Sequence, residues 1–256
     1  MKKTTLLLFI SLIVITNNLS AQNKDIFQIK TYITNTEDQL KTTENFLKNA
    51  YLPALKRIGI KSVGVFKPKT IDSDSIKKVM VLIPFSSLEQ FSNIDGQLLK
   101  DNVYLTAGAP YLNATFDKKP YLRIESIVME AFDGRKNITL PSLNNPRKDR
   151  VYELRSYESH TEAILKNKID MFHDGEFELF DKLGFNAVFY AEVLSGPKMP
   201  NLMYMTTFEN QTSRDEHWKA FFASPEWKVL SANPVYKNNV SKSEITFLTP
   251  TEYSDY

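Results

Sequence analysis

Three histidines, His160, His173 and His217, are the side chains best suited to acid–base or metal chemistry at neutral pH. His173 and His217 fall on predicted helices and are the catalytic candidates, because either could serve as a general base or a metal ligand if it faced a pocket. No His-x-x-x-His or Glu-x-x-His spacing accompanies them. The simpler interpretation places all three at surface or edge positions, and we predict no metal site and no cofactor.

A run of acidic residues is the next candidate for chemistry. Asp174, Glu176, Glu178 and Asp181 crowd one predicted helix, and some of them are three or four residues apart, so they share a face. Such a run is usually a solvated face, and Lys182, four residues after Glu178, supports that interpretation.

The sequence lacks the common catalytic motifs. With no cysteine among its 256 residues, disulfides, thiolate zinc sites, iron–sulfur clusters and cysteine nucleophiles are excluded. It contains no Gly-rich phosphate loop, serine nucleophile elbow or Walker sequence. No motif therefore specifies a reaction.

The composition is that of an ordinary globular protein, with 42% hydrophobic and 24% charged residues. When the first 21 residues are set aside, basic and acidic side chains both number 30, so the net charge is about zero. A neutral chain without a basic run has no electrostatic reason to bind nucleic acid or an anionic membrane. We predict neither as a partner.

Residues 1–21 have the features of a cleavable signal peptide. Lys2 and Lys3 form a basic start, and the apolar stretch 6–15 is too short to span a bilayer. Ala21 offers a small residue for cleavage before Gln22. An N-terminal membrane anchor is the alternative. Because no later stretch is apolar enough to span a bilayer, we predict a periplasmic or secreted protein without membrane insertion after cleavage.

The chain contains one pattern twice, 125 residues apart. The segment Phe27-Gln-Ile-Lys-Thr-Tyr32 corresponds to Tyr152-Glu-Leu-Arg-Ser-Tyr157, and each pair is identical or conservative. Further pairs at the same spacing are Thr36 with Thr161, Leu47 with Phe172, Leu55 with Phe180, and Gly59 with Gly184. The spacing later changes by two, so that Phe85 aligns with Phe208. This long gap-free match predicts a duplicated unit.

Each copy reads as strand, helix, strand, strand, helix, strand. In the first copy we predict strands at 28–34, 63–66, 79–85 and 121–132, and helices at 36–58 and 88–99. In the second we predict strands at 150–159, 185–194, 201–208 and 243–248, and helices at 161–183 and 214–230. Pro53 and Pro225 predict a kink or break in two of these helices.

The order β-α-β-β-α-β is typical of ferredoxin-like folds. One such unit leaves a face of its four-stranded sheet bare, so two units in tandem are expected to bury their sheets against each other. We therefore predict an α+β protein in which two tandem ferredoxin-like domains form a pseudo-dimeric α+β barrel. The predicted divisions are a signal peptide at 1–21, a first, divergent repeat at 24–134, a linker at 135–149 and a second repeat at 150–256.

Three motifs in the second copy are specific enough for comparison with known families. They are the strand 152–157, the junction Leu183-Gly184-Phe185, and Trp218-x-x-Phe221-x-x-Ser224-Pro225-Glu226-Trp227-Lys228. On these motifs, residues 150–256 resemble the NIPSNAP family. The first copy lacks both tryptophans and is reached mainly through the repeat. The resemblance implies a dimeric α+β barrel, similar in shape to monooxygenase-like barrels, and implies no single reaction.

Aromatic side chains are the remaining guide to a ligand site. Most must fill the core, with Trp218 and Trp227 as a packing pair. We expect a subset, with one arginine that could fix an anionic group, to line an apolar pocket inside the barrel. These ligand-binding candidates are Tyr152, Arg155, Tyr190, Tyr204 and Trp218. A barrel packed without a cavity is the alternative.

Two classes of function are consistent with these features. The first is an exported NIPSNAP-like binding protein for a small apolar or aromatic molecule or for a protein partner, with assembly into a homo-oligomer left open. The second is a cofactor-independent, monooxygenase-like enzyme, which requires His173 or His217 to meet a tyrosine in one enclosed cavity. The binding function requires only a pocket, so it is the function that we predict.

Overall fold

The computed structural model describes residues 24–69 and 76–256, so the predicted signal peptide lies outside the described residues. The strands of this part are β1 (Ile26–Thr34), β2 (Gly64–Pro68), β3 (Lys77–Phe85), β4 (Arg123–Ala131), β5 (Val151–Glu158), β6 (Asn186–Ser195), β7 (Asn201–Phe208) and β8 (Lys242–Pro250). The helices between β1 and β4 are α1 (Glu37–Phe46), α2 (Leu52–Arg57), α3 (Leu88–Leu98), α4 (Asn102–Ala107) and α5 (Ala109–Leu112). Those between β5 and β8 are α6 (Glu162–Met171), α7 (Phe177–Lys182), α8 (Gln211–Ala223) and α9 (Pro225–Ala232).

The strands close into one antiparallel barrel in the order β1-β3-β2-β8-β5-β7-β6-β4. Each half contributes four adjacent strands in the same relative order, and the halves join where β2 pairs with β8 and β4 pairs with β6. The predicted α+β barrel is thereby confirmed. It forms a single closed sheet shared by both halves, rather than two clearly separate tandem domains.

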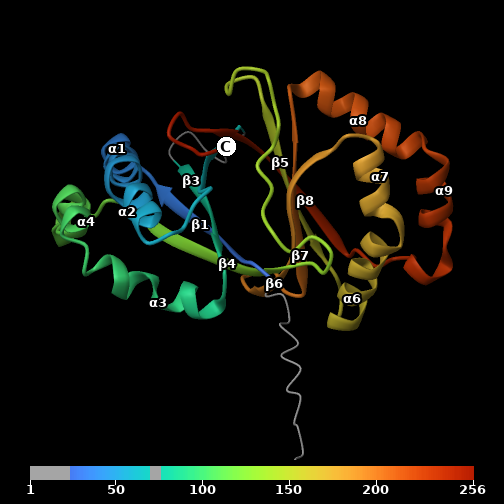
Figure 1. Cartoon of the computed structure of the whole chain (residues 1–256), viewed down its shortest axis with the longest axis horizontal. Coiled ribbons are helices and arrows are strands. Elements are labelled where there is room, and N and C mark those ends of the chain that lie inside the picture. Colours follow the sequence, from blue (N-terminus) through green and yellow to red (C-terminus); the bar gives the residue numbers. More distant parts are fainter. Residues whose placement is uncertain (1–23, 70–75) are drawn as a thin grey trace, which may run out of the picture.

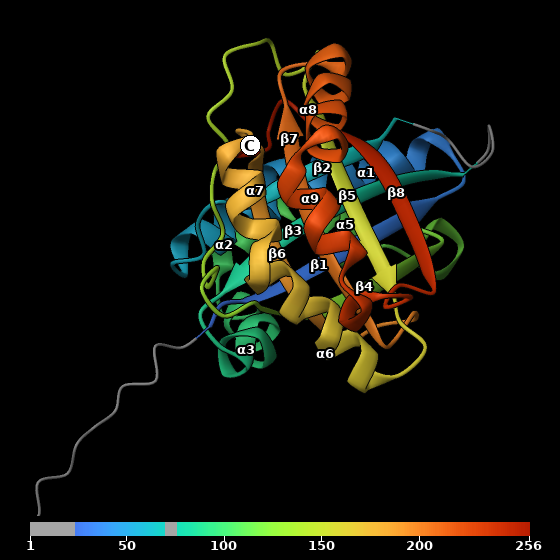
Figure 2. The same cartoon turned by 90° about the vertical axis from the view of Figure 1, so that its right-hand side faces the viewer.

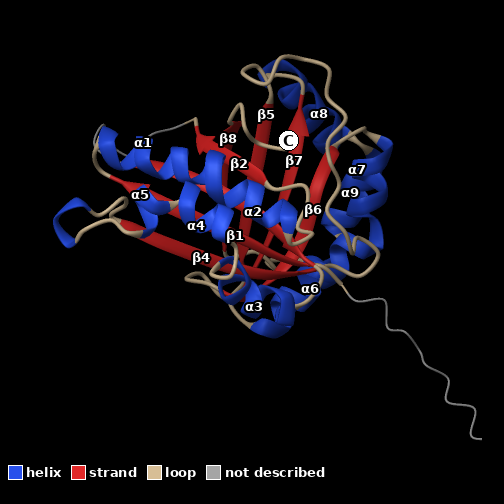
Figure 3. Cartoon of the chain, turned by 60° about the vertical axis from the view of Figure 1, so that its left-hand side comes forward, coloured by secondary structure: helices blue, strands red, loops and turns tan. Residues whose placement is uncertain are grey.

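Helices cover two opposite sides of the barrel (Figure 1). Those of the second half, α6 to α9, lie over β5 to β8 in Figure 2, and α1, α2, α4 and α5 lie over the strands of the first half in Figure 3. Within the described ranges, no helix is both long enough and apolar enough to cross a lipid bilayer.

The two halves repeat each other in local detail as well. The side chains of Thr36 and Thr161 cap the helices that follow, each accepting a hydrogen bond from a backbone N–H three residues on. Both helices then pass through a π-helical turn, at Leu47–Tyr51 and at Phe172–Glu176, again 125 residues apart. Gly59 and Gly184, at φ of +88° and +73°, follow the ends of α2 and α7.

The two prolines have different effects. Pro225 ends α8 and begins α9, so the predicted break is confirmed. Pro53 lies near the start of α2, which continues without a break from the turn at Leu47–Tyr51, so the helix is not interrupted at this proline. The irregularity near it is the π-helical turn. Helices α4 and α5 were not predicted, because both are short and are interrupted at Gly108.

Hydrophobic side chains fill three regions: the barrel interior and the layer under each set of helices. The chain end closes one end of the barrel. Tyr256 is 3% exposed, and its ring lies 5.6 Å from that of Phe66 and 6.4 Å from that of Tyr152. Asp255 fixes this tail, because its carboxylate and its backbone N–H both bond the backbone of Val63.

Candidate functional site

A pocket of about 380 Å³ lies between the outer face of the second-half strands and the helices over them, and we call it the Arg155 pocket. Its wall on the barrel side consists of Arg155 and Tyr157 on β5, Tyr204 on β7 and Ser243 on β8. On the helix side it is lined by Lys168, Met171, Glu176, Phe180, Trp218, Phe221, Phe222, Trp227 and Ser231, and it is closed by residues 236–240.

Arg155 is the central cation of this pocket and is only 7% exposed. Its Nε donates to Glu153 Oε1 at 2.5 Å and its Nη1 donates to the Tyr157 hydroxyl at 2.7 Å. The guanidinium also lies 3.8 Å from the centre of the Trp218 ring. Burial by itself lowers the pKa of Arg155, but Tyr204, Tyr157 and Glu153 outweigh it and raise that pKa above its usual value. The guanidinium therefore stays charged.

Glu153 is the counter-charge beneath the pocket and is fully buried. Besides the bond from Arg155, its Oε2 accepts from Arg214 Nε at 2.6 Å and from Trp218 Nε1 at 3.1 Å. One carboxylate thus orients a guanidinium on β5 and two side chains on α8. Arg214 is also paired with Asp215 at 3.0 Å, so Arg155 is the cation of this cluster that lines the pocket.

Tyr157 and Tyr204 extend the polar surface. Their hydroxyl oxygens are 2.9 Å apart and share a hydrogen bond. Burial, together with Tyr157, raises the pKa of Tyr204 well above its usual value, so Tyr204 keeps its proton at neutral pH. This pair offers hydrogen bonds to a ligand.

A buried ion pair between Lys168 and Glu176 forms another part of the wall. Glu176 is 2% exposed, so the interpretation of the acidic run as a solvated face is wrong for this residue. The π-helical turn at Phe172–Glu176 changes the helical register, which brings Glu176 inward while Asp174 and Glu178 stay exposed. Lys182 pairs with Glu226 on α9, across the groove described below.

Three of the five ligand-binding candidates, Arg155, Tyr204 and Trp218, line this pocket together. Tyr190 is buried behind the wall, with its ring stacked 5.7 Å from that of Tyr204. Tyr152 lies inside the barrel, because successive residues of β5 face opposite sides of the sheet. The pocket that gathers the candidates is therefore under the helices, not inside the barrel as predicted.

Neither histidine candidate lies in the Arg155 pocket. His173 is exposed and lines a separate hollow of about 300 Å³, in which the described lining residues include no tyrosine. His217 donates from Nδ1 to the Ser213 carbonyl at 2.6 Å and packs against the rings of Phe185 and Phe208. Among the residues that the structure describes, the His–Tyr pair required by the enzyme hypothesis is not assembled in a cavity at either histidine.

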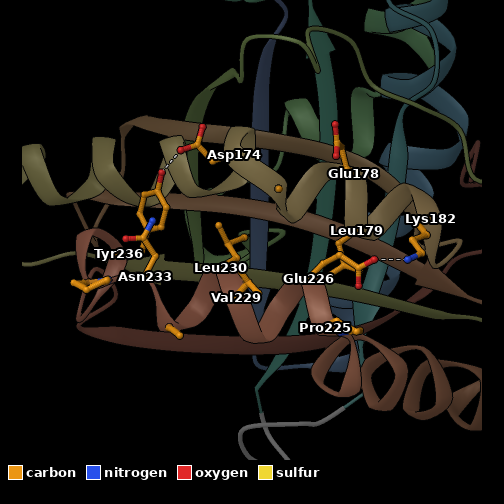
Figure 4. Close-up of a pocket in the computed structure, with 13 residues that line it drawn as sticks. Asp174, Glu178, Leu179, Lys182, Pro225, Glu226, Val229, Leu230, Asn233 and Tyr236 are labelled. Carbon is orange, nitrogen blue, oxygen red and sulfur yellow. Dashed lines mark hydrogen bonds and ion pairs between the residues drawn. The ribbon is translucent and has the colours of Figure 1, made fainter.

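A third hollow is the groove of about 1090 Å³ between α7 and α9 (Figure 4). Its floor is apolar, with Leu179 and Leu230, and its polar groups bridge the two sides. The Tyr236 hydroxyl donates to Asp174, and Lys182 pairs with Glu226. Tyr236 also lines the Arg155 pocket, so this residue and α9 separate the two hollows.

The Arg155 pocket can hold a small planar molecule by aromatic contact and fix an acceptor group by charge and hydrogen bonds. In the described part of the chain, no group of three or more histidine, aspartate or glutamate side chains is arranged to hold a metal ion. Sequence reasoning missed Lys168, Met171 and the closing residues 236–240, because only the packing of α6 and of the loop before β8 against β5 brings them to Arg155.

These features define a closed α+β barrel with a helix-covered pocket in its second half. The NIPSNAP family model matches residues 152–255, which confirms the resemblance predicted for that half. No curated protein matches the chain.

Solved structures share the barrel over most of the chain. A protein provisionally named a monooxygenase from Fusobacterium nucleatum subsp. nucleatum is 8% identical, with 89% of this chain and 92% of that chain covered and a TM-score of 0.57. Another protein so named, from Lactobacillus acidophilus NCFM, is 11% identical, with coverages of 89% and 94% and a TM-score of 0.56. An anthrone oxidase-like protein is 12% identical, with coverages of 90% and 92% and a TM-score of 0.50. At these identities the likeness shows the fold alone.

Proposed function

We propose that this chain is a binding protein for a small planar aromatic molecule that carries an acidic or hydroxyl group, held in the Arg155 pocket. The observation that carries the proposal is a difference between the halves. The space that is a pocket in the second half is filled in the first half by the chain's own aromatic rings.

The equivalence of the two spaces follows from the 125-residue spacing, by which Tyr32 corresponds to Tyr157 and Phe46 to Met171. Tyr157 and Met171 line the Arg155 pocket. In the first half, the Tyr111 ring lies 3.8 Å from Phe46, stacked on it, and 6.4 Å from Tyr32. A phenol ring supplied by α5 thus occupies the position that a ligand would take in the second half.

The electrostatic surroundings define the group that such a ligand carries. Lysine and arginine side chains outnumber acidic ones in the lining of the pocket, and Arg155 keeps its charge although buried. The bonds of Arg155 to Glu153 and Tyr157 use Nε and Nη1, which leaves Nη2 to meet an acceptor group of a ligand. A carboxylate or phenol oxygen next to an aromatic ring fits this arrangement.

The sequence itself supplies the reporter for a test. The chain has two tryptophans, and both line the pocket. We expect 4-hydroxybenzoate to change tryptophan fluorescence excited at about 295 nm and to bind measurably by titration calorimetry, whereas cyclohexanecarboxylate binds at least about tenfold more weakly because it cannot stack.

Two variants complete that test. Met171→Phe introduces the residue of the first half into the pocket and should weaken 4-hydroxybenzoate binding about tenfold, whereas Met199→Phe, at a residue that is 52% exposed, should leave it unchanged. Equal binding of both acids, or equal effects of both substitutions, would contradict an aromatic ligand at this pocket.

We also propose that the halves are tandem copies of one ferredoxin-like unit, supported by the repeated caps, π-helical turns and strand order.

Export to the periplasm or medium is a proposal that rests on residues 1–21. A protein partner is a weaker proposal, supported by the exposed side chains of Phe222, Val229 and Val235 on the outer helices and the turn after them. Assembly into a homo-oligomer remains a proposal on the same basis.

A further inference from the structure

The two ends of the barrel are built differently. One end is closed by the tail at Tyr256, packed on Phe66 and Tyr152. At the other end, the described residues leave a hollow of about 720 Å³ that reaches over the seam between β2 and β8, and we call it the barrel cup. Part of its lining faces the barrel interior, and part, with Leu40 on α1, Lys67 on β2 and Phe247 on β8, lies on the outer face of the sheet beside this seam. It is separate from the Arg155 pocket.

The wall of the barrel cup is mostly aliphatic. Inward-facing residues near the open end of five strands form it: Thr31, Met80, Ile127, Leu154, Ser156 and Met203. Below them, Ile29, Leu82, Met129 and Met205 are buried in the interior and provide an apolar floor. Methionine side chains adapt their shape to a flexible guest, so this wall suits an alkyl chain better than a rigid ring.

The rim of the barrel cup is rich in lysine. Lys67, Lys77, Lys78 and Lys198 line it together with Glu125 and Glu244. Lys67 pairs with Glu44 at 2.8 Å, and Lys198 pairs with Glu244. Both lysine side chains are more than two-fifths exposed, so these pairs are weak and can rearrange.

The two carboxylates that hold these lysines each have a second donor. Glu44 also accepts from the Tyr253 hydroxyl at 3.2 Å, and Glu244 is also paired with Lys242 at 2.8 Å. Lys67 and Lys198 can therefore turn toward a guest without leaving either carboxylate unpartnered. This arrangement provides two cations for an anionic head group above an apolar cup.

We infer that the barrel cup binds an anionic amphiphile with an unbranched alkyl chain, the chain against the methionine wall and the head group between Lys67 and Lys198. The molecule could arrive as a free carboxylate or as a membrane lipid, and both present the same chemistry to the cup.

Methionine methyl groups separate this site from the Arg155 pocket. Met80 and Met203 line the barrel cup, and Met171 lines the Arg155 pocket. In protein labelled with methyl-¹³C methionine, decanoate below its micelle concentration should shift the Met80 and Met203 signals and leave Met171 in place. If Met80 and Met203 stay in place, or if Met171 moves most, the inference is overturned.

Charge reversal tests the head-group contact. We expect Lys67→Glu with Lys198→Glu to weaken decanoate binding about tenfold, and Lys182→Glu, in an exposed pair elsewhere, to leave it unchanged. Equal affinities in both variants would overturn the assignment. Sedimentation with phosphatidylglycerol vesicles identifies the source: pelleting that the double substitution abolishes assigns a membrane lipid, and decanoate binding without pelleting assigns a free amphiphile.

Discussion

The two helix-covered layers of the molecule share one frame and differ in what fills it. In the first half, Phe46, Tyr51 and Tyr104 pack together and Tyr111 stacks on Phe46. In the second half, the corresponding space contains the cluster around Glu153 and the Arg155 pocket. Tyr104 and Tyr111 come from α4 and α5, whereas the segment between β7 and β8 contains α8 and α9 and supplies Trp218 and Trp227. The same arrangement of strands and helices thus forms a filled layer or a layer with a pocket according to the side chains that these helices supply.

The cations at corresponding positions of β1 and β5 show the same difference. Lys30 corresponds to Arg155 and lies over the rings of Tyr32 and Tyr51 at 5.5 and 5.3 Å. Burial lowers the pKa of Lys30, although Asp95 opposes this effect. For Arg155, the two tyrosines and Glu153 raise the pKa instead. The second half therefore keeps a firmly charged group under its helices, as anion binding requires.

The substitution that we expect to reduce stability most removes the charge of Glu153. Glu153→Gln introduces the residue that the first half has at this position, Gln28, and leaves Arg155 and Arg214 without their shared carboxylate. We expect a loss of about 3 kcal/mol in the free energy of unfolding, measured by urea denaturation, because removing one partner of a buried ion pair strands the other.

The matched variant in the first half is Gln28→Ala, which removes a 2.8 Å hydrogen bond from Gln28 to Ser126. It should cost about 1 kcal/mol, the usual net value of a neutral hydrogen bond. If the two substitutions cost the same, the second-half cluster has no special electrostatic role and the contrast between the layers fails.

Removing the Tyr111 ring from the first-half layer is expected to have an intermediate effect on stability. Tyr111→Ala removes the ring stacked on Phe46 and should lower the free energy of unfolding by about 2 kcal/mol, since Tyr111 is only half-buried. It should also create a hollow that p-cresol fills, so added p-cresol should raise the melting temperature of this variant by more than it raises that of the wild type, in which only the Arg155 pocket accepts a phenol. Tyr111→Phe serves as the control with the ring retained. If p-cresol raises the melting temperature of the alanine variant no more than that of the wild type, the Tyr111 ring does not occupy a space that a ligand could fill.

The smallest effect concerns the outer edge of the second-half layer, where no residue of α9 is buried. The hydrogen bond to Asp174 raises the pKa of Tyr236 to about 12. Because this pKa lies above the usual tyrosine value of about 10, the hydrogen bond from Tyr236 stabilises the folded state fully below pH ~10. That stabilisation is lost as the pH rises through about 12. Tyr236→Phe should be slightly less stable than the wild type at pH 9, and the difference should vanish near pH 12 in urea denaturation. A difference in the free energy of unfolding that does not change with pH would assign the effect of the substitution to packing.

Local patterns in the sequence predicted the strands and the long helices well, because alternation, caps and glycines act within a few residues. The strand 201–208 is observed with the same bounds, and the break at Pro225 is confirmed. The inward turn of Glu176 was not predicted, because a π-helical turn shifts the register without a signal in residue types. Arg155 and Tyr204 were identified as candidates from their residue types and their places on predicted strands, and Trp218 as an aromatic residue. Their shared pocket depends on how α8 packs on the barrel.

The sequence by itself determined that one β-α-β-β-α-β pattern occurs twice and that its second copy is rich in aromatic side chains. Only the tertiary structure decided that the eight strands close into one barrel, that one end of it is closed by Tyr256, and which face of β5 carries the pocket. The physical reason is that side-chain periodicity sets which residues share a face, whereas long-range packing sets what that face meets.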